Sequence, residues 1–304
     1  MQALYQIAGT TRQAHHLLAR SRAAQSDRLA HLHELLLSER CKHPSMGLKK
    51  LYHRLKPDFI GRDAFIDYGM ENGLGPVFAY KKPSLSRPST LKPYSNLVGD
   101  LRLFDINQIW VSDITYLKVN QKWCYLTFIE DVYSRQIIGY CAAENLYAIA
   151  NINALEMALK HRKISKFNYQ LIHHSDRGSQ YLSNDYVQKL NDYEIKISLA
   201  YSCFDNAHME SANNIIKNEY LVHRPIKSFQ DLCRFVRQDV WFYNNERPHG
   251  SLNRMTPVEF ERYILNIPIF QRTPLTIFSD KSKKNNLLIV GPDNQQLTFN
   301  FPRF

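Results

Sequence analysis

The sequence has no paired-cysteine motif and no long apolar run. Its five cysteines are odd in number and scattered over 304 residues, and no Cys-x-x-Cys pair occurs. This excludes a disulfide framework or a zinc ribbon as the basis of the fold and favours a reducing compartment. No apolar run approaches the roughly 18 residues of a membrane span, and no secretory hydrophobic region opens the chain. We therefore expect a cytoplasmic protein.

Acidic residues are in the minority. The chain has 39 Lys and Arg against 28 Asp and Glu, a net charge of +11 and a pI near 9.3. The excess is +7 in residues 1–100 and +3 in residues 269–304, but only +1 in residues 101–268. Basic flanks around a nearly neutral middle favour a polyanionic partner, nucleic acid before membrane. A merely basic globular protein is the alternative that composition leaves open.

Four regions are predicted along the chain. Residues 1–80 are expected to be helical, with short helices near 48–55 and 61–73 joined by a turn. This pair resembles a helix-turn-helix DNA reader, although any small helical bundle fits the same pattern. Residues 81–104 have the basic Pro/Ser composition of a linker. Residues 105–265 form the predicted core, and residues 266–304 a basic tail with a possible hairpin.

The central region is predicted to be an α/β fold with a mixed five-stranded sheet. Three strands, at about 109–119, 123–131 and 136–141, form an antiparallel meander. A helix, a strand ending near Asp176, a second helix and a strand at 196–200 follow. A helix starting near Asp205 and two more, at about 228–245 and 256–264, complete the region. This order is typical of a layered sheet flanked by helices.

Three carboxylates stand out from this pattern. Asp113 interrupts an otherwise apolar strand, where an unpaired charge is costly. Asp176 ends the fourth strand, which neighbours the first if the first strand is central. Glu210 lies early on the helix that follows, on a polar stripe with Asn213, Asn214 and Lys217. Oxygen ligands without His or Cys favour a hard cation, Mg²⁺ or Mn²⁺. Such a site can hold two ions for phosphoryl transfer.

Several motifs in this region resemble one family. The chain reads WVSDITY at 110–116, DVYSR at 131–135, HSDRGSQY at 174–181, DNAHMES at 205–211 and YNNERPHGSL at 243–252, with Thr-Pro at 256–257. In this order they resemble the integrase core of insertion-sequence transposases, most closely the OrfB subunit of the IS-three family. Residues 44–74 resemble the helical segment that precedes that core.

The resemblance implies an RNase H-like, retroviral-integrase-like fold and a metal-dependent DDE site. Asp113, Asp176 and Glu210 would be catalytic and would bind two Mg²⁺ or Mn²⁺ ions. Lys217 would contact transposon-end DNA. We also expect Arg177, Gln180, Asn213 and Arg247 to contact DNA or to position the carboxylates. The implied activity is cleavage of double-stranded DNA at insertion-sequence ends and strand transfer, with an OrfA partner or fusion and a homo-oligomer assembled on the DNA.

Other residues in the motifs have more ordinary interpretations. Asp131 is the rival carboxylate, and we expect it to be structural. His173 and His174 are expected to pack or to support the site rather than to bind metal. The 33 residues between Asp176 and Glu210 are about two fewer than the family usually has, a difference that falls in the loop 201–204. This shortening motivates one alternative, a catalytically impaired DNA-binding relative that regulates transposition. A nuclease of RNA–DNA hybrids is the other.

Overall fold

A computed structural model describes residues 11–77, 94–99, 101–164, 171–200, 207–277, 288–290 and 296–298. The chain forms two compact units, residues 1–77 and residues 78–304. Most of the predicted linker and most of the predicted tail lie outside the described residues. Within the described ranges no helix combines the length and the hydropathy that a membrane span requires.

In residues 11–77 the amino-terminal unit contains three helices, α2 (Arg12–Lys42), α3 (Leu48–Leu55) and α4 (Arg62–Glu71). The predicted helices at 48–55 and 61–73 are confirmed, and the helical region predicted before them contains one continuous helix of 31 residues. The carboxyl-terminal third of α2 packs on α3 and α4 around a small core, formed by Leu32, Leu36, Met46, Leu48, Leu51, Phe65 and Leu74. Residues 12–28 of α2 are almost entirely exposed.

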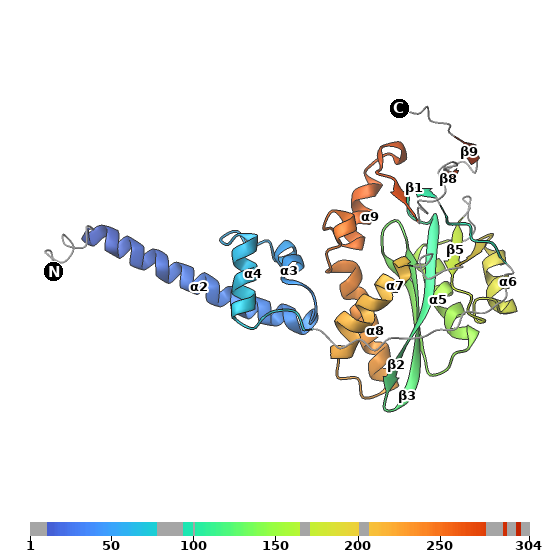
Figure 1. The fold of residues 1–304 in the computed structure, drawn as a ribbon, viewed down its shortest axis with the longest axis horizontal. Helices are drawn as coiled ribbons and strands as arrows, with labels where there is room; N and C mark the ends of the chain where they lie inside the picture. Colours follow the sequence, from blue (N-terminus) through green and yellow to red (C-terminus); the bar gives the residue numbers. More distant parts are fainter. Residues whose placement is uncertain are drawn as a thin grey trace. The chain divides into compact units, whose positions relative to one another are not determined.

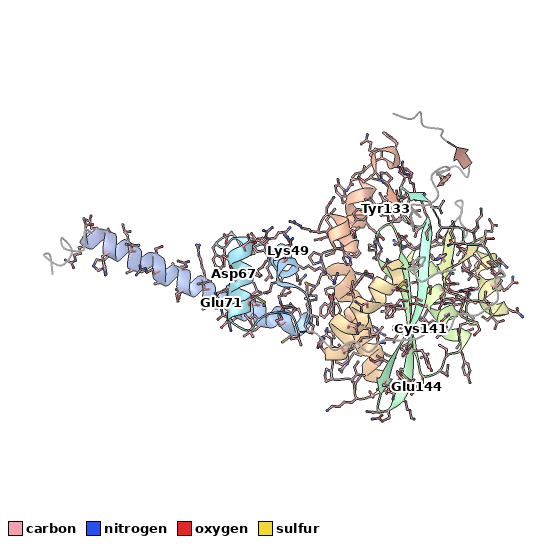
Figure 2. The ribbon with its side chains drawn as sticks, in the orientation of Figure 1. Lys49, Asp67, Glu71, Tyr133, Cys141 and Glu144 are labelled. Atoms are coloured by element: carbon pink, nitrogen blue, oxygen red, sulfur yellow. The ribbon has the colours of Figure 1, made fainter. Side chains whose placement is uncertain are left out.

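Charge is distributed unevenly over this unit. The exposed half of α2 carries four arginines, Arg12, Arg20, Arg22 and Arg28. By contrast α4 exposes three acidic side chains, Asp63, Asp67 and Glu71, of which the last two are labelled in Figure 2. A recognition helix must approach phosphates, and negative charge opposes that approach. The electrostatics therefore favour α2 over α4 as the nucleic-acid-binding element of this unit.

The second unit is organised around a five-stranded mixed sheet, as predicted (Figure 1). The strand order is β4-β3-β2-β5-β6, and the strands are β2 (Ile109–Val119), β3 (Lys122–Asp131), β4 (Ile137–Ala143), β5 (Ile172–Ser175) and β6 (Lys196–Leu199). The first three strands pair antiparallel, and β5 and β6 join them in parallel. The opening strand β2 is therefore central and lies beside β5.

Alternation along β2 and β3 builds one hydrophobic core on each face of the sheet. Val111 and Phe128 belong to a core shared with α7 (Ala207–Asn214) and α8 (Phe229–Asn245). Trp110 and Ile129 face α5 (Ala148–His161) and α6 (Asn184–Asp192). The sheet is thus covered on both faces, with α7 on the face toward which Asp113 also points. This layering confirms the predicted α/β architecture.

The chain after β6 departs from prediction at one helix. The predicted continuous helix from residue 205 is α-helical only to Asn214, then becomes the π-helix η2 (Ile215–Tyr220) and the 3₁₀ turn η3 (Leu221–His223). The loop 201–206, where the sequence is shortened, lies outside the described residues. The turn η4 (Gly250–Leu252), α9 (Pro257–Leu265) and the turn η5 (Ile269–Gln271) follow α8.

A small second sheet has the order β7-β1-β8-β9. Its strands are β7 (Leu275–Thr276), β1 (Arg102–Leu103), β8 (Leu288–Val290) and β9 (Gln296–Thr298). Strands β8 and β9 pair antiparallel, as the predicted carboxyl-terminal hairpin requires, while its turn at 291–295 lies outside the described residues.

Candidate active site

The register of the sheet brings Asp113 and Asp176 together. The last parallel pair between β2 and β5 joins Ser112 to Ser175, and the next residue on each strand is the predicted aspartate. Neighbouring strands lie about 4.8 Å apart, so the two carboxylates leave the sheet side by side. Because β5 ends there, the rest of β2 has no described strand on that side.

The electrostatics of Asp113 show that it shares its surroundings with the other two carboxylates. Burial and then the charge of Asp176, with a smaller contribution from Glu210, raise the pKa of Asp113 to about 7. Asn213 opposes this shift, because its Nδ2 donates a hydrogen bond of 2.7 Å to Asp113 Oδ2. Carboxylates that repel one another in this way have a strong electrostatic demand for a cation.

Asp176 is held by the turn that follows its strand. The backbone N–H of Gly178 donates to Asp176 Oδ1 at 3.0 Å. Burial raises the pKa of Asp176, whereas this hydrogen bond and the charge of Arg177 lower it. A Cβ at position 178 would lie 3.0 Å from Asp176 Oδ1 and 3.1 Å from Gln180 Oε1, so glycine leaves room for the turn to close on the carboxylate.

Helix α7 presents Glu210 because its neighbours are buried in the core. Met209 and Ala212 are 0% and 1% exposed, which turns Glu210 outward to solvent. One turn later, Asn213 is 6% exposed and reaches Asp113. Next to it, the side-chain oxygen of Asn214 accepts a hydrogen bond of 2.6 Å from Asn218 in η2. The predicted polar stripe therefore divides into a side chain that contacts the site and one that does not.

Lys217 lies in the π-helical segment, and its ammonium is 4.6 Å from the ring centroid of Tyr116 on β2. The wider π turn changes the direction of Lys217 from that of a regular helix. Burial lowers the pKa of Lys217. Tyr116 was not predicted as part of the site. In the sequence, the feature that could have drawn attention to Tyr116 is its place as an aromatic residue three positions after Asp113 on the same predicted strand.

The remaining predicted DNA contacts differ in their placement. Arg177 and Gln180 are partly exposed in the turn after Asp176, and Gln180 Nε2 donates to the carbonyl of Leu146 at 3.2 Å. Arg247 is 3% exposed and makes a two-pronged ion pair with Glu219, the closest contact being 2.9 Å. This ion pair joins η2 to the turn after α8, and the predicted role of Arg247 as a DNA or supporting contact stays a prediction.

Asp131 and the two histidines have the supporting positions that we expected. Asp131 is 0% exposed and accepts hydrogen bonds from the backbone N–H groups of Asn107, Tyr133 and Ser134. His173 Nε2 is 2.9 Å from the Tyr186 hydroxyl, and His174 Nδ1 is 2.8 Å from the Ser198 hydroxyl. Burial lowers the pKa of His173 to about 3, so its ring is neutral.

A second buried carboxylate, Glu130, was missed by sequence reasoning. It is 1% exposed, burial raises its pKa to about 7, and the Tyr243 hydroxyl donates to it at 3.2 Å. The guanidinium of Arg135 is 3.6 Å away. A cavity of about 210 Å³ lies beside it, lined by Glu130, Arg135, Ser211, Ile215, Tyr243, His249 and Ser251. Asp113 was singled out because it is a charged residue within a strand, and the same argument applies to Glu130.

Asp113, Asp176 and Glu210 have the chemistry of ligands for a divalent metal. All three offer oxygen ligands, the set preferred by hard cations such as Mg²⁺ and Mn²⁺. A bound cation would relieve the repulsion that raises the pKa of Asp113. Asn213 would keep one oxygen of Asp113 in place through the contact described above. The arrangement is chemically suited to reactions at phosphate groups.

Comparison with known proteins gives a consistent result. Integrase core domain families match residues 106–202 and residues 191–257. The insertion element IS600 uncharacterized 31 kDa protein of Shigella sonnei is 37% identical over 161 residues, which cover 52% of this chain and 58% of that protein. Transposase InsF for insertion sequence IS3A of Escherichia coli (strain K12) is 33% identical over 162 residues, covering 51% and 54%. The chain thus spans little more than half the length of these relatives.

Among solved structures, the HTLV-2 integrase catalytic core domain in complex with magnesium, in its trimeric form, is 20% identical with a TM-score of 0.41. The match covers 55% of this chain and 99% of that one.

Proposed function

The chain belongs to the integrase core domain family, and on that premise we propose that it is an insertion-sequence transposase that cleaves and joins DNA strands. The proposal is supported by the register that places Asp113 and Asp176 at the ends of the same strand pairing, and by the charges of Asp176 and Glu210 acting on Asp113. The similarity to transposase InsF supports the same activity. Strand cleavage and strand transfer would use one site.

In this proposal the three carboxylates bind two Mg²⁺ or Mn²⁺ ions. Bound divalent ions supply an activated nucleophile and charge stabilisation for phosphoryl transfer. The chain's own residues orient the site, since Asn213 fixes an oxygen of Asp113 and the Gly178 N–H fixes an oxygen of Asp176. Lys217 and Arg177 provide positive charge beside the carboxylates and would hold the DNA backbone at the site. Gln180 would assist them.

The proposed partners follow from charge and similarity. Double-stranded DNA, as terminal repeat and as target, matches the net charge of +11 and the exposed arginines on α2. An OrfA-type partner or fusion is proposed from the similarity to insertion-sequence transposases. A homo-oligomer on DNA is proposed because two element ends must be processed together.

The test uses purified full-length chain, with and without its OrfA-type partner, and labelled terminal-repeat DNA taken from the sequence flanking the gene. With Mg²⁺ we expect end cleavage and joining, both abolished in Asp176→Asn and Glu210→Gln and both absent when the metal is chelated. Asp185→Asn, which removes an exposed carboxylate on α6, is a matched control that should remain active.

Two results would overturn the proposal. Wild-type chain that binds the DNA but neither cleaves nor joins it, with Asp176→Asn behaving identically, would indicate a DNA-binding regulator. Cleavage restricted to RNA–DNA hybrids would indicate a nuclease instead.

A further inference from the structure

On the hairpin formed by β2 and β3, a row of four side chains consists of two aromatic rings in contact, flanked by two lysine side chains, one from the hairpin and one from η2. The ammonium of Lys217 is 4.6 Å from the Tyr116 ring centroid. The Tyr116 and Trp123 rings meet edge to face, with centroids 5.2 Å apart. The ammonium of Lys118 lies 4.9 Å from the Trp123 ring centroid. The register pairs Trp123 with Lys118, so the row follows one face of the hairpin.

Trp123 is an unusual residue to leave in solvent. It is 47% exposed, whereas Trp110 on the same sheet is fully buried. An exposed tryptophan offers a large rigid surface, which is typical of a binding position. Lys118 and Lys122 beside it are also exposed. Along the chain, the acidic residue that comes directly after β4 is Glu144, which is labelled in Figure 2.

The row lies beyond Asp113 along β2. Side chains alternate between the two faces of a strand, so Tyr116 and Lys118 lie on the sheet face opposite to Asp113, and Lys217 reaches Tyr116 from the segment after α7. Because β5 ends at Ser175, this stretch of β2 has an open edge in the described part of the sheet. At about 3.3 Å per residue, Tyr116 is about 10 Å and the level of Trp123 about 17 Å from Asp113 along the strand. With a spacing of about 3.4 Å between stacked bases, this corresponds to about three to five nucleotides.

We propose that this row is a stacking platform for unpaired nucleotides of the DNA that the chain binds. Aromatic faces stack on bases, and the lysines at the two ends of the row match phosphates of the same strand. A base within a duplex already stacks on its neighbours, so Trp123 engages only a nucleotide released from pairing. The position relative to the cut rests on the proposed function, whereas the stacking chemistry rests on the row itself. The two lysines that now cover the rings turn to the backbone when DNA binds.

A strand of nucleic acid explains the row better than a protein surface does. A protein that covered Trp123 would also have to bury Lys118 and enclose Lys217, and a second copy of this basic chain would bring more positive charge to the same place. A bound polyanion would be attracted by each of these positive charges.

The test compares two labelled DNA probes of arbitrary sequence, because stacking tolerates any base. One is a fully paired 30-mer, and the other is the same duplex with a five-nucleotide unpaired 3′ flap. Affinity is measured by fluorescence anisotropy with the full-length chain and with divalent metal chelated, so that no cleavage occurs. We expect wild type to prefer the flapped probe. Trp123→Ala should weaken binding of that probe about fivefold or more and leave the paired probe unchanged.

Matched variants separate stacking from a general loss of structure. Trp241→Ala removes a tryptophan of similar exposure, 51%, on α8 and should leave both affinities unchanged. Trp123→Phe keeps an aromatic face and should recover most of the preference. Quenching of tryptophan fluorescence by the flapped probe should disappear in Trp123→Phe and persist in Trp241→Phe.

The outcomes distinguish the platform from the proposed activity. Equal affinity for the two probes in wild type, or a Trp123→Ala change that is the same for both, overturns the platform even if the chain cleaves DNA. A Trp123-dependent preference in a chain that never cleaves terminal-repeat DNA upholds the platform and overturns the transposase. A change of oligomeric state in Trp123→Ala at constant affinity assigns the surface to a second copy and overturns the platform.

Discussion

At the residue scale, the hydrogen bond from Asn213 to Asp113 distinguishes one amide of α7 from the next. Asn213 Nδ2 donates to Asp113 Oδ2 at 2.7 Å, whereas Asn214 accepts from Asn218. Groups that orient a metal ligand typically contribute about 10- to 100-fold in metal affinity or activity. The difference between two adjacent asparagines is therefore measurable.

Asn213→Ala is expected to lower metal-dependent DNA cleavage about 10- to 100-fold and to raise the Mg²⁺ concentration needed for half-maximal rate. Asn214→Ala should retain wild-type behaviour in both measurements. Asn213→Asp should be more damaging than Asn213→Ala, because it adds a like charge beside Asp113. Equal rates in the two alanine variants would contradict a positioning role for Asn213.

Glu130 gives the clearest dependence of stability on pH. Its pKa in the folded chain, about 7, lies above the value of about 4.3 in an unfolded chain, mainly because burial disfavours its charged form. The folded state therefore holds the proton more tightly. This contribution to stability is fully present below about pH 4 and is lost as pH rises through about 7.

Glu130→Gln keeps an acceptor for Tyr243 but cannot ionise. Relative to wild type, its free energy of unfolding should rise between pH 5 and pH 8, by about 2 kcal/mol after allowance for the nearby Arg135. Chemical denaturation at several pH values measures this difference. A constant difference between the two proteins across that range would show that Glu130 does not titrate on folding.

At the scale of elements, β4 and α5 approach closely at Gly139. A Cβ at this position would lie 2.2 Å from the carbonyl oxygen of Ala154. That oxygen belongs to the helix backbone and cannot move without moving α5. Gly139→Ala should therefore destabilise the chain by about 1–3 kcal/mol, a typical cost of overpacking. Gly99→Ala, with nothing within 4 Å of its added Cβ, should change stability by no more than about 0.5 kcal/mol in the same thermal unfolding experiment.

The ion pair between Arg247 and Glu219 joins η2 to the turn after α8. Because the guanidinium is buried, we expect Arg247→Met to lower stability by about 1–3 kcal/mol, with no change in how DNA affinity depends on salt. Arg177→Gln should do the reverse, weakening DNA binding and reducing the salt dependence at unchanged melting temperature. A lower salt dependence in Arg247→Met would instead support the predicted DNA contact of Arg247.

At the scale of the whole molecule, nucleic-acid affinity should depend strongly on its positive charge. The four exposed arginines of α2 are the largest basic group on a described helix of the first unit. Each phosphate contact contributes about −0.9 to the slope of log affinity against log salt concentration. Replacing all four by glutamine should make the measured slope less negative by up to about 3.6.

Replacing the same four arginines by lysine keeps the charge and should preserve the slope. An unchanged slope in the glutamine variant would show that these four arginines do not contact DNA phosphates. Helical content, followed by circular dichroism, shows whether α2 remains folded in both variants.

The sequence by itself determined the elements of the second unit and the identity of its three carboxylates. Period-two alternation marked β2 to β4, because one face of each strand must be apolar. A charge inside a strand marked Asp113 because burying it requires a partner. The family motifs added the order and the expected roles. These properties depend on residues that are close together in the sequence, so the sequence pattern alone can reveal them.

Only the tertiary structure decided which side chains meet. The pairing of Ser112 with Ser175 places Asp113 beside Asp176, although 62 residues separate them in the chain. The π turn directs Lys217 to Tyr116, and a buried ion pair joins Arg247 to Glu219. Register, helix type and long-range ion pairs depend on packing between distant segments. A pattern of neighbouring residues cannot contain that information, because each contact is fixed by the fold as a whole.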